Sequence, residues 1–323
     1  MAFVPEILKS FFEPAFPRHA ISISADYVAS MRVSGGVTPA VENLACLPLA
    51  SGVVVPSHSN PNILDRAAMQ RALHSVVQKT GSLRKEVNLL IPDTVARVFV
   101  IPLEHVPTQS GDMVQLLQFR VKKSIPFPLE EAALAYQIQT LGPDQHEVVL
   151  TVMQRSILRE YESAVEALGL DPGFVTVEHF GVAGLMEKQP ADWKTKPTLL
   201  FRLAPRCFTT SIFHDGFLRF YRALERDYSV GSSAGLTAEV LFDEIYPSLA
   251  YFQDRFERRI EKILLSGLGV PNEPLCQAIQ KLAECPTAEI RAERSVSRLA
   301  SGASTDQVNQ VFAPLIGLEL AAA

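Results

Sequence analysis

The sequence predicts an α/β protein with two lobes and a small α+β subdomain inserted into the first lobe. Short apolar runs with the period of β-strands alternate with amphipathic helical segments, which is typical of helices packed on sheets. Both halves of the 323 residues open with a similar series of strands followed by a helix. We therefore expect an internal structural duplication, although no sequence repeat is visible.

The composition is that of a soluble globular protein and excludes several function classes. The chain is 47% hydrophobic and 20% charged, and 30 Lys and Arg against 35 Asp and Glu give a net charge of -5. This balance provides no basic surface for a nucleic acid. The apolar runs are far shorter than the roughly 20 residues that span a bilayer. We expect a cytoplasmic protein with no transmembrane segment and no nucleic-acid partner. Four scattered cysteines and seven scattered histidines match no metal site, disulfide framework or catalytic triad.

The first lobe is expected to contain two neighbouring strands, an amphipathic helix and a buried strand. Residues 20–24 and 28–33 alternate apolar and polar side chains. Residues 65–80 carry apolar side chains at helical spacing, and Gly81 marks the helix end. Residues 87–91 form a short apolar run of the kind found in buried strands.

The same patterns predict the remaining elements. The expected insert has strands at 95–102, 133–140 and 147–154 and helices at 112–124 and 156–168. The expected second lobe has strands at 198–203, 209–213, 217–221 and 263–269 and helices from Thr237 and at 275–283 and 311–320. We divide the chain into an N-terminal segment (1–18), a first lobe (19–94 with 170–196), an insert (95–169) and a second lobe (197–323).

One motif resembles a known family. The segment Ser124-Ile-Pro-Phe-Pro-Leu-Glu-Glu131 is similar to the hallmark of type IV pilus assembly proteins of the PilM kind. Residues 166–172, 175–180 and 264–269 resemble further family segments, and the order of these features matches over about residues 19 to 320. The resemblance implies the actin-like (ribonuclease H-like) ATPase fold of the cell-division protein FtsA.

The resemblance also implies a function. Proteins of this kind form a cytoplasmic platform, peripheral at the inner membrane, that binds the N-terminal tail of the single-pass membrane protein PilN and contacts other platform proteins. We therefore expect a platform of a type IV pilus or a related secretion machine. A type II secretion platform component shares the fold and stays an alternative, although it is normally joined to a transmembrane helix.

The nucleotide-binding motifs of the family are altered in this chain. Two loops that begin Asp-Ile-Gly normally hold the phosphates and the hydrated magnesium ion. The first Asp and Gly correspond here to Ser22 and Ser24, and the second pair corresponds to Arg202 and Ala204. The adenosine-binding turn keeps two glycines, Gly267 and Gly269. The segment between Tyr221 and Thr237 is short where the family has a subdomain that closes over adenine, so we expect a reduced second lobe.

These changes predict a pseudo-ATPase with no ATP or Mg²⁺ cofactor. Serine lacks the charge that holds a hydrated magnesium ion, and an arginine would repel the metal. Two alternatives stay open: a working ATPase that binds nucleotide through substituted contacts, and a different anion site formed by Arg202 and Arg206.

Three residues of the proline-rich motif are candidates for partner binding. Ile125, Phe127 and Leu129 form an apolar turn between a predicted helix and a predicted strand. An extended tail docked beside this turn could pair with a strand edge. The alternative is that Phe127 and Leu129 only seal the insert onto the first lobe. One side of a possible N-terminal helix, which we expect to pack on the body or on a partner, carries the apolar residues Phe3, Ile7, Leu8, Phe11 and Phe12.

Overall fold

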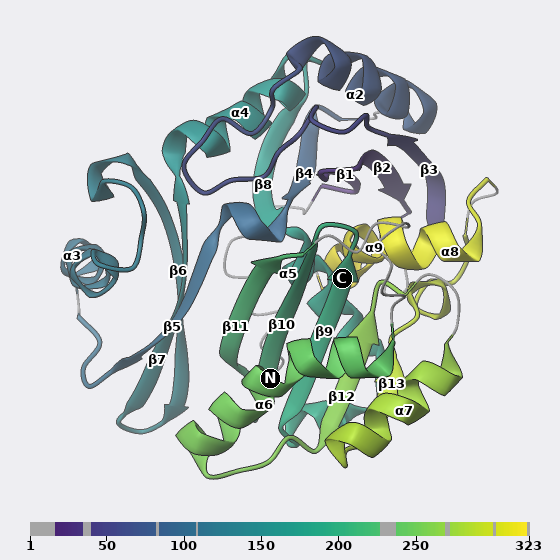
Figure 1. Ribbon diagram of the computed structural model, residues 1–323. Coiled ribbons are helices and arrows are strands. Elements are labelled where there is room, and N and C mark those ends of the chain that lie inside the picture. The colour runs from purple at the N-terminus through teal and green to yellow at the C-terminus, as the bar shows by residue number, and fades with distance from the viewer. Residues whose placement is uncertain are drawn as a thin grey trace.

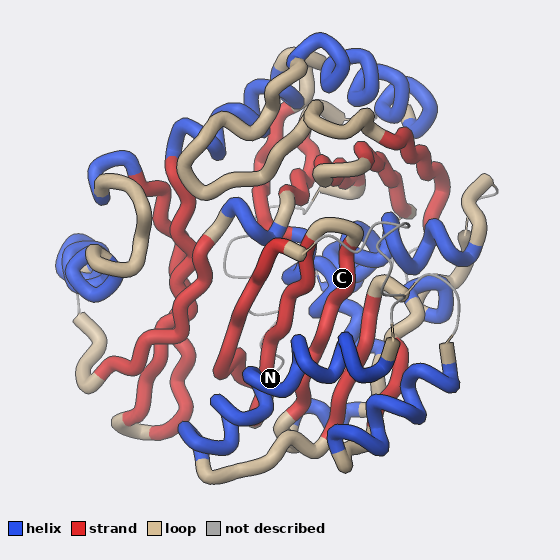
Figure 2. The backbone as a smooth tube through the Cα atoms, in the orientation of Figure 1, coloured by secondary structure: helices blue, strands red, loops and turns tan. Residues whose placement is uncertain are grey.

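The described part of the protein forms two five-stranded sheets and one three-stranded sheet (Figures 1 and 2). A computed structural model describes residues 17–34, 40–81, 84–107, 109–226, 237–268, 272–299 and 302–321. Helices cover the outer face of each five-stranded sheet, and two further helices lie between the sheets (Figure 1). Residues 3, 7, 8, 11 and 12 of the expected N-terminal helix lie outside the described residues.

The first sheet has the strand order β3-β2-β1-β4-β8. The strands β1, β2 and β3 are antiparallel, whereas β4 and β8 run parallel to β1. Helices α2 and α4 supply buried side chains to the core on one face of this sheet. The bounds are β1 (His19–Ile23), β2 (Tyr27–Val33), β3 (Val41–Pro48), α2 (Arg66–Thr80), β4 (Glu86–Ile91), α4 (Arg155–Glu166) and β8 (Asp171–Val177).

The second sheet repeats the topology of the first, with the order β11-β10-β9-β12-β13. Again three antiparallel strands come first, and two parallel strands follow on the other side of the first strand. The expected structural duplication is therefore confirmed. The bounds are β9 (Thr198–Ala204), β10 (Cys207–His214), β11 (Phe217–Glu225), α6 (Ala238–Phe256), β12 (Lys262–Ser266), α7 (Glu273–Ala283) and β13 (Thr287–Glu289).

The two lobes share one apolar core around α5 (Glu178–Gly184) and α9 (Ala313–Ala321). These helices approach so closely that a Cβ atom on Gly184 would lie 2.0 Å from the backbone oxygen of Gly317. Only glycine permits this contact. Residues 188–197, which read as a polar linker, instead place Trp193 in the shared core with no exposed surface.

The insert is a three-stranded sheet with the order β5-β7-β6 and one covering helix. Its elements are β5 (Arg97–Leu103), α3 (Ser110–Val121), β6 (Ala132–Gly142) and β7 (Gln145–Gln154). Helix α4 also falls within the expected range 95–169, but its buried side chains, such as Tyr161, belong to the core of the first lobe.

Glu319 on α9 provides a pH-dependent test of how the two lobes pack. Its side chain is 6% exposed, and Asn88 Nδ2 donates a hydrogen bond to its Oε1 atom at 3.2 Å. Burial raises its pKa from 4.5 to about 8, although Asn88 and Arg18 act in the opposite direction. The folded protein thus keeps a proton that the unfolded chain loses above pH 4.5. Stability should therefore fall as the pH rises from 4.5 to about 8.

We predict that Glu319→Gln removes most of this pH dependence. In urea unfolding, the free energy of unfolding of the variant should exceed that of the wild type at pH 8 by on the order of 1 to 3 kcal/mol. The difference should shrink at pH 5, because this pH lies only slightly above the unfolded pKa of 4.5, so that ionisation of the carboxyl in the unfolded chain favours unfolding only slightly. Parallel pH profiles for the two proteins would contradict this assignment.

Candidate functional site

The altered nucleotide motifs lie where the two lobes face each other. Ser22 and Ser24 stand at the end of β1, and Arg202 and Ala204 stand at the end of β9. Gly267 follows β12 with φ +87°, and a Cβ atom there would lie 1.9 Å from the backbone oxygen of Leu203. This close approach to β9 gives Gly267 a structural role, and Gly269 lies outside the described residues.

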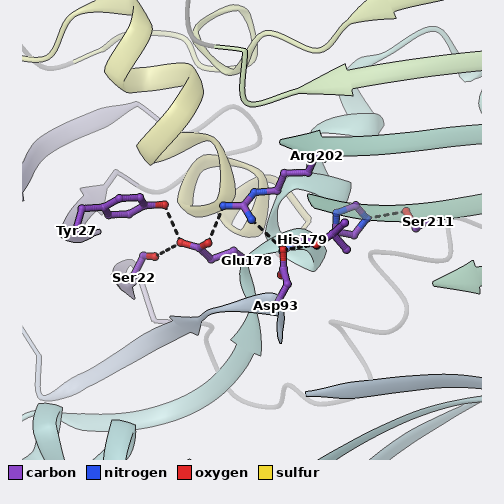
Figure 3. Close-up of polar contacts among 8 residues, drawn as sticks. Ser22, Tyr27, Asp93, Glu178, His179, Arg202 and Ser211 are labelled. Carbon is purple, nitrogen blue, oxygen red and sulfur yellow. Dashed lines mark hydrogen bonds and ion pairs between the residues drawn. The ribbon is translucent and has the colours of Figure 1, made fainter. Parts of the chain in front are cut away.

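Arg202 forms two ion pairs across the boundary between the lobes (Figure 3). Its Nη1 atom donates to Asp93 Oδ2 at 2.8 Å, and its Nη2 atom donates to Glu178 Oε2 at 2.6 Å. Arg202 is only 2% exposed. Asp93 begins the short 3-10 helix Asp93–Val95 after β4, and Glu178 begins α5, so both carboxylates come from the first lobe. The second-lobe arginine is therefore held by two first-lobe acids.

The remaining oxygen atoms of these acids also have partners. Glu178 Oε1 accepts hydrogen bonds from Ser22 Oγ at 2.7 Å and from Tyr27 Oη at 2.8 Å. The backbone N–H of His179 donates to Asp93 Oδ1 at 2.7 Å. Asp93 Oδ2, which already accepts from Arg202, accepts a second hydrogen bond from Thr209 Oγ1 at 2.8 Å. A buried ion pair is tolerated only when its charges and lone pairs are satisfied in this way.

The charge states follow from this geometry. Burial lowers the pKa of Arg202, but Glu178 and Asp93 outweigh that effect and raise the pKa well above its usual value, so the guanidinium stays charged. Burial, and then Arg202, lower the pKa of His179 to about 3, so its ring is neutral at pH 7. The His179 ring bonds to Ser211 Oγ at 2.7 Å. The cluster therefore contains one fixed cation, which the sequence located, and two fixed anions, which it did not.

A pocket of about 470 Å³, lined by charged and apolar residues together, lies beside this cluster, between the turn after β1 and the turn after β9. Arg206 lines the pocket and pairs with Asp26 of the first lobe at 2.7 Å. Arg202 is not among the residues that line it. The two arginines considered for an anion site thus lie in different surroundings.

The partner-binding candidates pack within the insert. Phe127 is 8% exposed and belongs to the core between α3 and the three-stranded sheet. Ile125 and Leu129 are partly buried against the same core. Phe127 therefore seals the insert's own helix onto its own sheet.

An apolar groove of about 360 Å³ lies between the insert and the first lobe. One wall is β6, the edge strand of the three-stranded sheet, and the other is β8, the edge strand of the first sheet. Tyr136, Phe174 and Phe180 supply aromatic rings to the lining. Sequence reasoning did not locate this groove, because it arises from the order of strands in two different sheets.

Neither a metal site nor a membrane-spanning helix is found in the part of the chain that the structure describes. Among those residues, no group of three or more histidine, cysteine, aspartate or glutamate side chains is placed to hold a metal ion. No helix formed by the described residues has both the length and the apolar character needed to cross a membrane.

Two lobes of duplicated topology, joined by a shared core and carrying an inserted sheet, define a protein of the actin-like class, as the sequence predicts. A family model described as "Type IV pilus assembly protein PilM" matches residues 21–228. The chain belongs to this family.

A solved structure agrees with the fold. A structure of a "PilM-PilN type IV pilus biogenesis complex" is similar with a TM-score of 0.80 and 16% sequence identity, over 96% of this chain and 100% of that chain. An actin-like ATPase-fold protein of unknown function from Bacteroides thetaiotaomicron shows a TM-score of 0.48 and 14% identity, over 93% and 96% of the two chains. The cytoplasmic domain of EpsL, from the Vibrio cholerae type II secretion system, shows 0.46 and 11%, over 94% and 93%.

We predict that Arg202→Met strongly destabilises the protein. The substitution leaves Asp93 and Glu178 buried without a counter-charge, which costs roughly 3 to 5 kcal/mol in unfolding experiments. Adding Asp93→Asn and Glu178→Gln to the same variant should restore part of this loss, because neutral amides need no counter-charge.

The matched control is Arg206→Met, at an ion pair whose arginine side chain is 42% exposed. Exposed pairs contribute about 1 kcal/mol or less, so this variant should unfold close to the wild type. Equal losses for the two variants in urea unfolding, followed by circular dichroism, would contradict the role given to Arg202.

Proposed function

We propose that this protein is a non-catalytic cytoplasmic platform of a type IV pilus or related secretion machine. In this proposal it lies at the inner membrane through its partners and binds the N-terminal tail of a PilN-like membrane protein. The observation that supports tail binding best is the groove between β6 and β8, whose two walls are both edge strands.

The groove suits an extended peptide. An edge strand offers unpaired backbone groups, so an added segment gains main-chain hydrogen bonds while its alternate side chains enter pockets. The lining is mostly apolar, with only Gln137, Thr151, Glu162 and Thr176 as polar residues. The proposed occupant is therefore an extended segment rich in apolar side chains. Membership of the PilM family and the likeness to a PilM–PilN complex support a PilN-like partner.

The proline-rich turn then has an indirect role. It leads through the 3-10 helix Leu129–Glu131 into β6, the groove wall. Ile125, Phe127 and Leu129 lie in or against the insert core that also contains Ala132 of β6. We propose that these three residues hold β6 in place and that the tail contacts β6 and β8 themselves.

The residues at the altered motifs do not fit a magnesium nucleotide. The Ser22 hydroxyl donates to Glu178, and both carboxylates nearest to Arg202 are occupied by the guanidinium and by hydroxyl or backbone donors. A fixed positive charge at this place opposes a divalent cation. We therefore propose that the protein neither binds nor hydrolyses ATP, and we derive no catalytic step.

Calorimetric titration with ATP and Mg²⁺ tests the non-catalytic part. We expect no binding heat at millimolar nucleotide and no phosphate release above the buffer rate. Micromolar binding together with turnover would show a working ATPase with substituted contacts and would overturn this part of the proposal.

Ala135→Arg tests the tail site. Ala135 is an exposed residue of β6 that lines the groove, and a long charged side chain there would fill it. We expect a synthetic peptide carrying the N-terminal tail of the PilN-like protein to lose more than about tenfold in affinity by calorimetry. Thr140→Arg is the matched control, on the same strand but outside the groove lining. Unchanged affinity in Ala135→Arg, or an equal loss in Thr140→Arg, would contradict the site.

A further inference from the structure

The side-chain amide of Gln139 holds the insert against the second lobe by pairing with backbone groups, as a neighbouring strand would. Gln139 on β6 is 2% exposed. Its Nε2 atom donates to the backbone oxygen of Leu218 on β11 at 3.0 Å, and its Oε1 atom accepts from the Leu218 N–H at 2.9 Å. One side chain thus satisfies both backbone groups of a residue on the edge strand of the second sheet.

An ion pair lies next to this contact. Glu147 on β7 stands directly opposite Gln139 in the strand register. Arg219, the neighbour of Leu218, places its Nη1 atom 3.1 Å from Glu147 Oε2. The side chains of Glu147 and Arg219 are 11% and 14% exposed, so the pair is largely shielded from water. Polar contacts from two strands of the insert therefore meet two consecutive residues of β11.

The same sheet face forms a wall of the groove. Because side chains alternate along a strand, Gln139 shares its face of β6 with Ala133, Ala135 and Gln137. Those three residues line the groove. The face of β6 that would contact the tail therefore also carries Gln139, the residue that bonds to the second lobe.

The opposite wall belongs to the first lobe. Strand β8 is part of the first sheet, and Phe180 follows it at the start of α5. Phe180 also reaches the second lobe, because its ring centroid lies 5.5 Å from that of Tyr221 on β11. Both walls of the groove therefore contact the same strand, β11. Gln139 makes this contact from the β6 wall, and Phe180 makes it from the β8 wall.

We infer that Gln139 is a positioning residue that sets the width of the groove by tethering the β6 wall to β11. This inference rests on the proposed function and adds a consequence to it. Because linkage is reciprocal, a tail that prefers the tethered groove must in turn stabilise the contact between Gln139 and Leu218. Tail binding in the groove should therefore stabilise the backbone of β11 in the second lobe.

The test compares Gln139→Met with Gln154→Met. Methionine keeps the length of glutamine but neither donates nor accepts as the amide does. Within the described residues, the side-chain amide of Gln154 on β7 donates to Glu131, which belongs to the insert itself, so its substitution leaves the contact with β11 intact. Affinity for the synthetic tail peptide is measured by calorimetry, and amide hydrogen exchange of β11 is followed with and without the peptide.

We expect Gln139→Met to bind the peptide roughly five- to fiftyfold more weakly. The substitution removes the hydrogen-bond partner of the Leu218 backbone groups, and with it the contact that holds the β6 wall against β11. Gln154→Met should bind like the wild type. In the wild type the peptide should slow exchange of the Leu218 amide, which belongs to a strand outside the groove lining. This protection should disappear in Gln139→Met.

The outcomes separate the two proposals. Wild-type binding with no slowing of exchange at Leu218 overturns the inference and leaves the proposed function standing, and it needs no variant to fold. Equal peptide affinity in Gln139→Met and the wild type has the same meaning. No binding to the wild type overturns the proposed tail site and the inference together.

Discussion

The ion pairs of Arg202 with Asp93 and Glu178 are the constraint on which the arrangement of the two lobes depends. An arginine that is 2% exposed is very costly to bury unless carboxylates lie within hydrogen-bond distance of its guanidinium. Both carboxylates come from the first lobe, from the end of β4 and the start of α5. The close packing of α5 on α9 at Gly184 and Gly317 also fixes how the two lobes meet, through steric fit. Charge and packing therefore specify one relative position of the lobes.

The side chains at the predicted vestigial nucleotide pocket make internal contacts in this chain. Ser22 and Tyr27 donate to Glu178, and Thr209 donates to Asp93, so the polar groups satisfy one another. A protein cation differs from a bound metal in one physical respect: it cannot leave. The contribution of Arg202 to cohesion between the lobes therefore does not vary with the concentration of a ligand.

The sequence predicted the periodic elements well, because amphipathic spacing and alternation are local properties. It missed β3 (Val41–Pro48), whose burial does not alternate cleanly. It also missed Asp93 and Glu178, since a buried acid and a surface acid look alike in a sequence. One signal was available: Arg202 interrupts the apolar run of β9, and a charge in a fully buried strand requires a partner. The identity of that partner depends on tertiary structure, as does the groove.

The contacts around the lobes are unequal in strength, and this inequality shows where the molecule can respond to a partner. The side chains at the Arg202 pairs are at most 3% exposed, whereas those of the Arg219–Glu147 pair are 11% or more. Because water weakens the attraction between charges, the slightly more exposed Arg219–Glu147 pair is held less strongly than the Arg202 pairs. The insert also meets β11 through a neutral amide, which is weaker than a charge-assisted pair. We therefore expect a ligand in the groove between β6 and β8 to disturb the contact between the insert and β11 before it disturbs the Arg202 pairs between the lobes.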